Sequence, residues 1–296
     1  MCGIVGLFLK DPRLEPQLGA MLSEMLDVMC DRGPDSAGFA VYGAGSPGLI
    51  KLTLRGPAGI DFIALGTQLG HPIIARDTHG VLSVAAAEES AVRARLASLA
   101  SLAPGVVVVG TGSRMELYKE VGLPVEVARR FKLEAMSGTH AIGHTRMATE
   151  SAVTTDGAHP FSTGPDQCLV HNGSLSNHAG VRRLLEREGL HVTTENDSEV
   201  AAAYLTYRMR GGDTLGEALE HSLSDLDGFY TFVVGTESGF GVLRDPIACK
   251  PAVMAETDGY VAFGSEYRAL AGLPGIANAR VFEPEPAKVY FWDRAA

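Results

Sequence analysis

The residue of this chain best suited to nucleophilic chemistry is a cysteine at position 2. Cys2 follows Met1 and precedes Gly3. Methionine is removed efficiently before small residues, so we expect the mature chain to begin with a thiol and a free α-amine on one residue. An α-amino group titrates at about pH 7.7 to 8.0 and can accept the thiol proton, directly or through one water. Taken alone, Met-Cys-Gly is better explained by a small residue that only lies at a terminus.

Three further motifs contain residues that could bind and activate an amide. Asn172 and Gly173 form an Asn-Gly pair, which could donate hydrogen bonds to an oxyanion or could simply be a hairpin turn. Arg146 carries a guanidinium that can bind a carboxylate through two parallel hydrogen bonds. Asp197 could bind an ammonium group, form a surface ion pair, or act as N-cap of a helix that begins at Ser198.

The order of five short motifs resembles that in the class II glutamine amidotransferases. This family belongs to the N-terminal-nucleophile (Ntn) hydrolase superfamily and includes the glutaminase domain of glutamate synthase. Each motif alone is a weak signal, whereas five in order over roughly the first 200 residues form a specific one. The motifs are MCGIVG at 1–6, RGPDSAG at 32–38, GHTRMATES at 143–151, HNG at 171–173 and NDSE at 196–199.

The resemblance implies an enzyme that hydrolyses the side-chain amide of L-glutamine, with a role for each matching residue. Cys2 would attack the amide carbon and form a γ-glutamyl thioester. The side chain of Asn172 and the backbone N–H of Gly173 would form the oxyanion hole. Arg146 would bind the α-carboxylate of glutamine, and Asp197 its α-ammonium group.

Other residues of the same motifs receive supporting roles. Thr149 and His159 lie where family members use groups that contact the substrate or close a loop. Arg32 and Asp35 are expected to brace the strand that follows Cys2.

Three histidines could be mistaken for catalytic or metal-binding groups. His144 and His171 are tempting general bases, but the α-amine already fills that role, so we expect them to be packed structural residues. His140 and His144 are four residues apart on an expected strand and lack a nearby carboxylate. We therefore predict no metal site.

The pattern of apolar residues predicts an α+β fold. A strand is expected at 3–9 and a helix at 18–30, while the last third of the chain alternates short strands and turns. The sequence favours two antiparallel sheets with helices outside, which the family resemblance identifies as the four-layer αββα sandwich of Ntn hydrolases. We expect a single amidotransferase domain over 2–296, with a β-α-β insertion at about 45–138 that could dock a partner.

Composition excludes several classes of partner. The net charge is −10 and no block of Lys and Arg could neutralise a nucleic acid backbone. No apolar stretch approaches the roughly 20 residues that cross a bilayer, and the start lacks a signal peptide, so a cytoplasmic protein is expected. The four cysteines form no CxxC pair, and no dinucleotide, P-loop or iron–sulfur motif is present. We predict no cofactor in this chain.

The acceptor of the ammonia is expected on a separate synthase subunit. Met147 stands where the aminosugar synthases have Trp, and the chain leaves no room after the glutaminase domain for an acceptor domain. It resembles the amidotransferase subunit of glutamate-synthase-like complexes, including N-methylglutamate synthase, whose partner would carry any flavin or iron–sulfur cluster. Two alternatives remain: a stand-alone hydrolase of γ-glutamyl amides, and a non-catalytic scaffold subunit.

Overall fold

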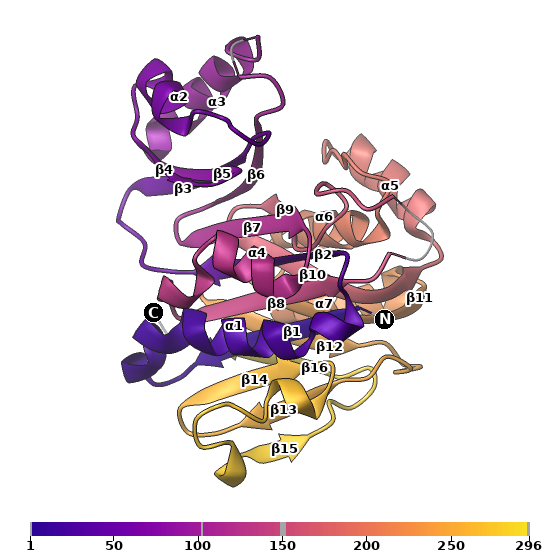
Figure 1. The fold of residues 1–296 in the computed structure, drawn as a ribbon. Helices are drawn as coiled ribbons and strands as arrows, with labels where there is room; N and C mark the ends of the chain where they lie inside the picture. Colours follow the sequence, from indigo (N-terminus) through magenta and orange to yellow (C-terminus); the bar gives the residue numbers. More distant parts are fainter. Residues whose placement is uncertain (1, 102, 149–151, 295–296) are drawn as a thin grey trace.

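The fold is built on two antiparallel sheets that pack face to face (Figure 1). It is seen in a computed structural model that describes residues 2–101, 103–148 and 152–294. One sheet has seven strands in the order β15-β13-β14-β1-β8-β2-β7, and the other has five in the order β16-β12-β11-β10-β9. Helices cover the outer face of each sheet, so the predicted four-layer αββα sandwich is confirmed.

The seven-stranded sheet is built around the first strand of the chain. Each side of β1 is covered by an antiparallel neighbour, β8 on one side and β14 on the other. Side chains of β1 alternate, so that Val5 and Leu7 face the outer helices while Ile4 and Phe8 face the second sheet. The strands are β1 (Gly3–Leu9), β2 (Ser36–Tyr42), β7 (Met115–Val121), β8 (His140–Arg146), β13 (Val253–Glu256), β14 (Tyr260–Gly264) and β15 (Arg280–Phe282), and the helices are α1 (Leu18–Val28) and α4 (Pro124–Arg130).

The five-stranded sheet has its own layer of helices. The strands are β9 (Phe161–Gly164), β10 (Gln167–Leu175), β11 (Gly228–Gly235), β12 (Gly239–Arg244) and β16 (Val289–Asp293). The covering helices are α5 (His178–Arg187), α6 (Asp197–Arg210) and α7 (Leu215–Asp225). Thr214 and Glu217 form a reciprocal capping box at the start of α7. The sequence-based helix at 198–210 is confirmed, but its N-cap is Asn196 and not Asp197, which is the first helical residue.

The core between the sheets brings β1 and β12 close together. Phe240 is fully buried there, and a Cβ atom on Gly6 would lie 2.8 Å from its ring. Any larger residue at position 6 would therefore push the ring away or separate the sheets. This close approach connects the strand that carries Cys2 to the sheet that carries β10.

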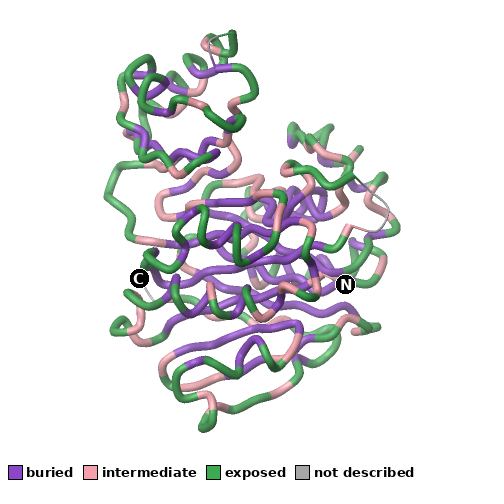
Figure 2. Tube along the Cα trace, viewed as in Figure 1, coloured by how far each residue is buried: buried purple, intermediate pink, exposed green. Residues whose placement is uncertain are grey.

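A separate lobe lies within the expected insertion (Figure 1). Its four-stranded antiparallel sheet has the order β4-β5-β3-β6. The strand, helix and strand of the expected β-α-β unit are present as β3, α3 and β6, but the unit was incomplete, because α2, β4 and β5 lie between β3 and α3. Two helices pack on this sheet around a core of its own. The elements are β3 (Leu49–Arg55), α2 (Phe62–Leu69), β4 (Ile73–Arg76), β5 (His79–Ala85), α3 (Glu89–Ser98) and β6 (Val107–Gly112). Figure 2 shows buried segments inside the lobe and exposed residues at 44–49 leading into it.

The expected insertion at 45–138 is larger than this lobe. Its last part, β7 and α4, belongs to the seven-stranded sheet and its outer layer. Division of the chain into a domain and an insertion stays a prediction. Within the described ranges, no helix has the length and apolar character needed to cross a membrane.

We predict that two phenylalanine-to-alanine variants will separate the stability of the lobe from that of the sandwich. Phe62 and Phe240 are 2% and 0% exposed, and truncation of such a side chain costs about 3–5 kcal/mol. Phe240→Ala should lower the free energy of unfolding of both sheets, whereas Phe62→Ala should loosen the lobe alone. Hydrogen exchange resolved by peptide measures both. Equal loss of protection in β1 and β10 in the two variants would contradict the separation.

Candidate active site

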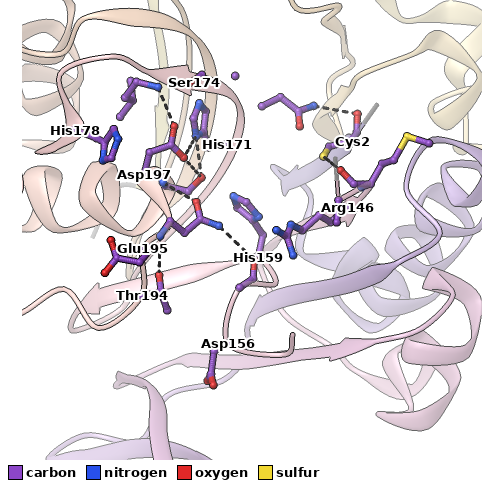
Figure 3. A pocket seen from close by; sticks show the side chains of 18 of the residues that line it. Cys2, Arg146, Asp156, His159, His171, Ser174, His178, Thr194, Glu195 and Asp197 are labelled. Carbon is purple, nitrogen blue, oxygen red and sulfur yellow. Dashed lines mark hydrogen bonds and ion pairs between the residues drawn. The ribbon is translucent and has the colours of Figure 1, made fainter. Parts of the chain in front are cut away.

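A cleft opens where the two sheets meet near the start of the chain. Its volume is about 1050 Å³. One wall comes from the start of β1 and the end of β8, and the other from β10 and the start of α6. Figure 3 shows Cys2 and Arg146 on one side of this cleft and His171 and Asp197 on the other.

Cys2 is held at the rim of the cleft through its backbone and its sulfur. Its carbonyl oxygen accepts a hydrogen bond from Arg32 Nε at 3.1 Å. Arg32 is itself ion-paired with Glu266. The sulfur accepts the backbone N–H of Met147 at 3.4 Å, and the next amide, that of Gly3, donates to Thr145 Oγ1 at 3.2 Å. The thiol is therefore fixed beside the end of β8.

Asn172 faces Cys2 from the other sheet. Its Nδ2 donates to the Cys2 carbonyl oxygen at 3.2 Å and to Ser265 Oγ at 3.4 Å. The next residue, Gly173, has φ +149°, and a Cβ atom there would overlap the carbonyl oxygen of Phe229. Only glycine fits this position without displacement of β11. The Asn172 amide thus lies against the Cys2 backbone, and both residues line the cleft together with Gly173.

Two opposite charges line the same cleft. Arg146 ends β8, is 8% exposed and donates from Nη1 to the Ala152 carbonyl oxygen at 3.5 Å. Asp197 starts α6, and its Oδ2 accepts the Leu175 backbone N–H at 2.8 Å. A fixed cation and a fixed anion on opposite walls suit a ligand that carries both a carboxylate and an ammonium group (Figure 3).

The remaining predicted residues have different surroundings. Thr149 lies outside the described residues. His159 lines the cleft, and its ring stacks on His144 with 4.0 Å between centroids. Asp35 Oδ2 accepts the Ala148 backbone N–H at 2.7 Å, so the carboxylate supports the segment after Arg146. Bracing of the strand after Cys2 by Asp35 stays a prediction.

Two residues that the motifs did not single out help to build the site. Ser265 follows β14 and contacts both walls, because Oγ accepts the Ile4 backbone N–H at 2.9 Å and also contacts Asn172. Glu199 accepts hydrogen bonds from the backbone and hydroxyl groups of Thr193 and Thr194, which line the cleft. Glu199 stands in the NDSE motif, so its position was visible in the sequence, whereas no motif marks Ser265.

Three histidines at or behind the cleft, His144, His159 and His171, are buried, and burial lowers their pKa values. Burial lowers the pKa of His144 to about 3. Burial also lowers the pKa of His171 to about 4, against the opposing effect of Asp197. The pKa of His159 is well below its usual value for the same reason. Nowhere in the described ranges do three or more His, Cys, Asp or Glu side chains form a group that could hold a metal ion.

We predict that stability falls as the pH is lowered from about 6.5 to 4. An unfolded histidine binds a proton below about pH 6.5, whereas His140 and His144 have a pKa of about 3 in the fold. The unfolded state therefore binds more protons in this window, at a cost of about 1.4 kcal/mol per histidine per pH unit. Urea unfolding at several pH values measures the slope, and His140→Gln should reduce it by one proton. An unchanged slope in that variant would contradict the assignment.

Comparison with known proteins identifies the family. A family model described as a glutamine amidotransferase domain matches residues 144–272. The chain is 63% identical to the glutamine amidotransferase-like protein GlxB of Rhizobium meliloti, over 99% of this chain and 98% of that protein. It is 35% identical to a putative glutamine amidotransferase of Methanothermobacter thermautotrophicus, over 98% and 99% of the two chains.

A solved structure supports the fold. The chain superimposes on glutamine phosphoribosylpyrophosphate amidotransferase from B. subtilis, complexed with ADP and GMP, with a TM-score of 0.64 at 20% identity. The match covers 99% of this chain and 47% of that one, so the two share one layered fold over about half of the larger protein. These similarities show that the chain belongs to the class II glutamine amidotransferase family, and that it is an enzyme with glutaminase activity.

Proposed function

We propose that Cys2, freed by removal of Met1, hydrolyses the side-chain amide of glutamine through a thioester. The observation that carries this proposal is the position of the Cys2 sulfur and the Asn172 amide in one cleft, with Gly173 beside them. The sulfur attacks the amide carbon, and the carbonyl oxygen becomes an oxyanion. Asn172 Nδ2 and the Gly173 N–H stabilise that charge. Expulsion of ammonia leaves the γ-glutamyl thioester, which water hydrolyses to glutamate.

The base in this mechanism is the α-amine of Cys2. It accepts the thiol proton and returns it to the departing nitrogen, so that nitrogen leaves as ammonia. The surrounding histidines support this assignment. Nε2 of His144 is already engaged with the His171 carbonyl oxygen and with Asn172, and burial lowers the pKa of His144 and His171 to about 3 and about 4.

Arg146 and Asp197 give the site its selectivity for an amino acid in this proposal. The guanidinium binds the α-carboxylate and the aspartate binds the α-ammonium group, so the side-chain amide is directed to Cys2. Binding energy from these distant groups then positions the reacting carbon. Thr149 and His159 remain candidates for additional substrate contacts.

We predict that a glutamine-like diazoketone, 6-diazo-5-oxo-norleucine, will label Cys2 alone. Intact mass should show loss of Met1 and one adduct, and peptide mapping should place that adduct on Cys2. Excess glutamine should block the reaction, because both ligands use the same cleft. Cys249→Ala is the matched control, since Cys249 is the exposed free cysteine and its removal should not change the labelling. Retained Met1 with no adduct would overturn the catalytic proposal in favour of a scaffold subunit.

We further propose that the ammonia passes to a synthase subunit on a separate chain, of the glutamate-synthase-like or N-methylglutamate synthase kind. Support comes from the two relatives matched over 98% and 99% of their own length. Neither has an unmatched region large enough for a synthase domain. The partner would bring any flavin or iron–sulfur cluster, and the shielded transfer would protect ammonia from protonation in solvent.

We predict that the amide nitrogen of glutamine reaches the product without mixing with bulk ammonium. The purified chain is combined with a candidate flavin-dependent synthase subunit, ¹⁵N-amide glutamine and excess unlabelled ammonium. Mass spectrometry of the product should show retained ¹⁵N. Cys2→Ala should abolish the glutamine-dependent product and leave the ammonium-dependent product. Dilution of ¹⁵N in the product to the value of the bulk ammonium would contradict shielded transfer. If the chain without a partner hydrolyses other γ-glutamyl amides faster than glutamine, a stand-alone hydrolase is favoured.

A further inference from the structure

We propose that His144 is a positioning residue that locks the side-chain amide of Asn172 in the orientation that presents N–H groups to the reacting oxygen. This inference rests on the proposed role of Asn172 in the oxyanion hole. His144 itself is not among the residues that line the cleft, so it would act through Asn172.

The proton on His144 can be assigned from its partners. Nε2 lies 3.2 Å from the backbone carbonyl oxygen of His171 and 3.3 Å from Oδ1 of Asn172. A carbonyl oxygen can only accept a hydrogen bond, so Nε2 must carry a proton. The atom of Asn172 that faces this N–H must therefore be its oxygen.

The other end of the Asn172 amide is then directed to the nucleophile. Nδ2 donates to the carbonyl oxygen of Cys2 at 3.2 Å and to Ser265 Oγ at 3.4 Å. In the flipped orientation, Oδ1 would face the Cys2 carbonyl oxygen and N–H₂ would face the N–H of His144. Acceptor would meet acceptor and donor would meet donor, so both ends of the amide oppose the flip. A flipped amide would also repel a developing oxyanion.

The position of His144 is itself firmly defined. It lies in β8 opposite Ile4 of β1 and Gly38 of β2, and it is fully buried. The ring of His159 stacks on it with an interplanar angle of 24°. No described residue gives Nδ1 of His144 a hydrogen-bond partner. Nε2 is therefore the atom through which His144 orients its neighbours.

The test compares variants that keep or remove the donor. His144→Phe retains a ring but has no N–H. Its kcat for glutamine hydrolysis should fall by about 100-fold with KM nearly unchanged. This loss lies near the lower end of that caused by removal of an oxyanion donor. His144→Gln can donate from its amide to both oxygens and should stay within about 10-fold of the wild type. Equal damage from the two variants would overturn the proposal.

His140→Phe is the matched control for burial and strand position. His140 lies four residues earlier in the same strand, is fully buried, and has its Nε2 within 2.8 Å of the Thr236 carbonyl oxygen. Its loss should destabilise the fold in the same way without lowering kcat. If the kcat of His144→Phe equals that of His140→Phe, His144 has only a structural role. If His144→Phe does not fold, His144→Asn replaces it, because the shorter amide cannot reach Asn172.

A double-mutant cycle with Asn172→Ala separates this inference from the proposed function. Asn172→Ala should lower kcat by about 10²- to 10³-fold, and adding His144→Phe should then cause little further loss. Additive losses would overturn the positioning role. Full activity in Asn172→Ala would instead overturn the oxyanion role of Asn172. If kcat falls in Asn172→Ala but not in His144→Phe, only the role of His144 is overturned. The labelling rate of Cys2 by 6-diazo-5-oxo-norleucine provides a second measurement in each variant.

Discussion

Face-to-face packing of the two sheets is the constraint on which the site depends. Cys2 belongs to one sheet and Asn172 to the other, so the distance between nucleophile and amide is set by the thickness of the core between them. Phe240 occupies the space left by Gly6 and lets β1 approach β12. The hydrogen bond from Asn172 Nδ2 to the Cys2 carbonyl oxygen then forms at the edge of this core, where side chains give way to the cleft.

The parts of the site predicted from the sequence are those carried by local motifs. Glycine at 173 has a physical reason at its own position, because its backbone lies against Phe229. Arg146 and Asp197 likewise have charges whose use can be deduced from the ligand. Ser265 could not be found in this way, because its hydroxyl matters only through contacts with Ile4 and Asn172, which are distant in sequence.

The fold was predictable as a class, whereas the complete set of elements in the lobe and the pairing of its strands were not. The continuous apolar run of β1 and the helical spacing in α1 are strong local signals, and the structure contains both elements. In the lobe, β4 has only four residues and α3 only two buried apolar positions. Such short elements are stabilised by packing against one another, and the periodicity of their own apolar residues is too short to predict them. Pairing of β3 with both β5 and β6 is a long-range choice that periodicity alone does not reveal.

The region between the RGPDSAG and GHTRMATES motifs supports the cleft indirectly, through a residue that lines it. Lys119 of β7 donates from Nζ to the carbonyl oxygens of Asp156 and Ala158 at 3.2 and 2.8 Å. Arg55, at the end of β3, forms an ion pair with the Asp156 side chain. Asp156 lines the cleft, so both the seven-stranded sheet and the lobe support one wall of the site. Arg55 therefore links the lobe to that wall through an ion pair whose carboxylate side is exposed to solvent.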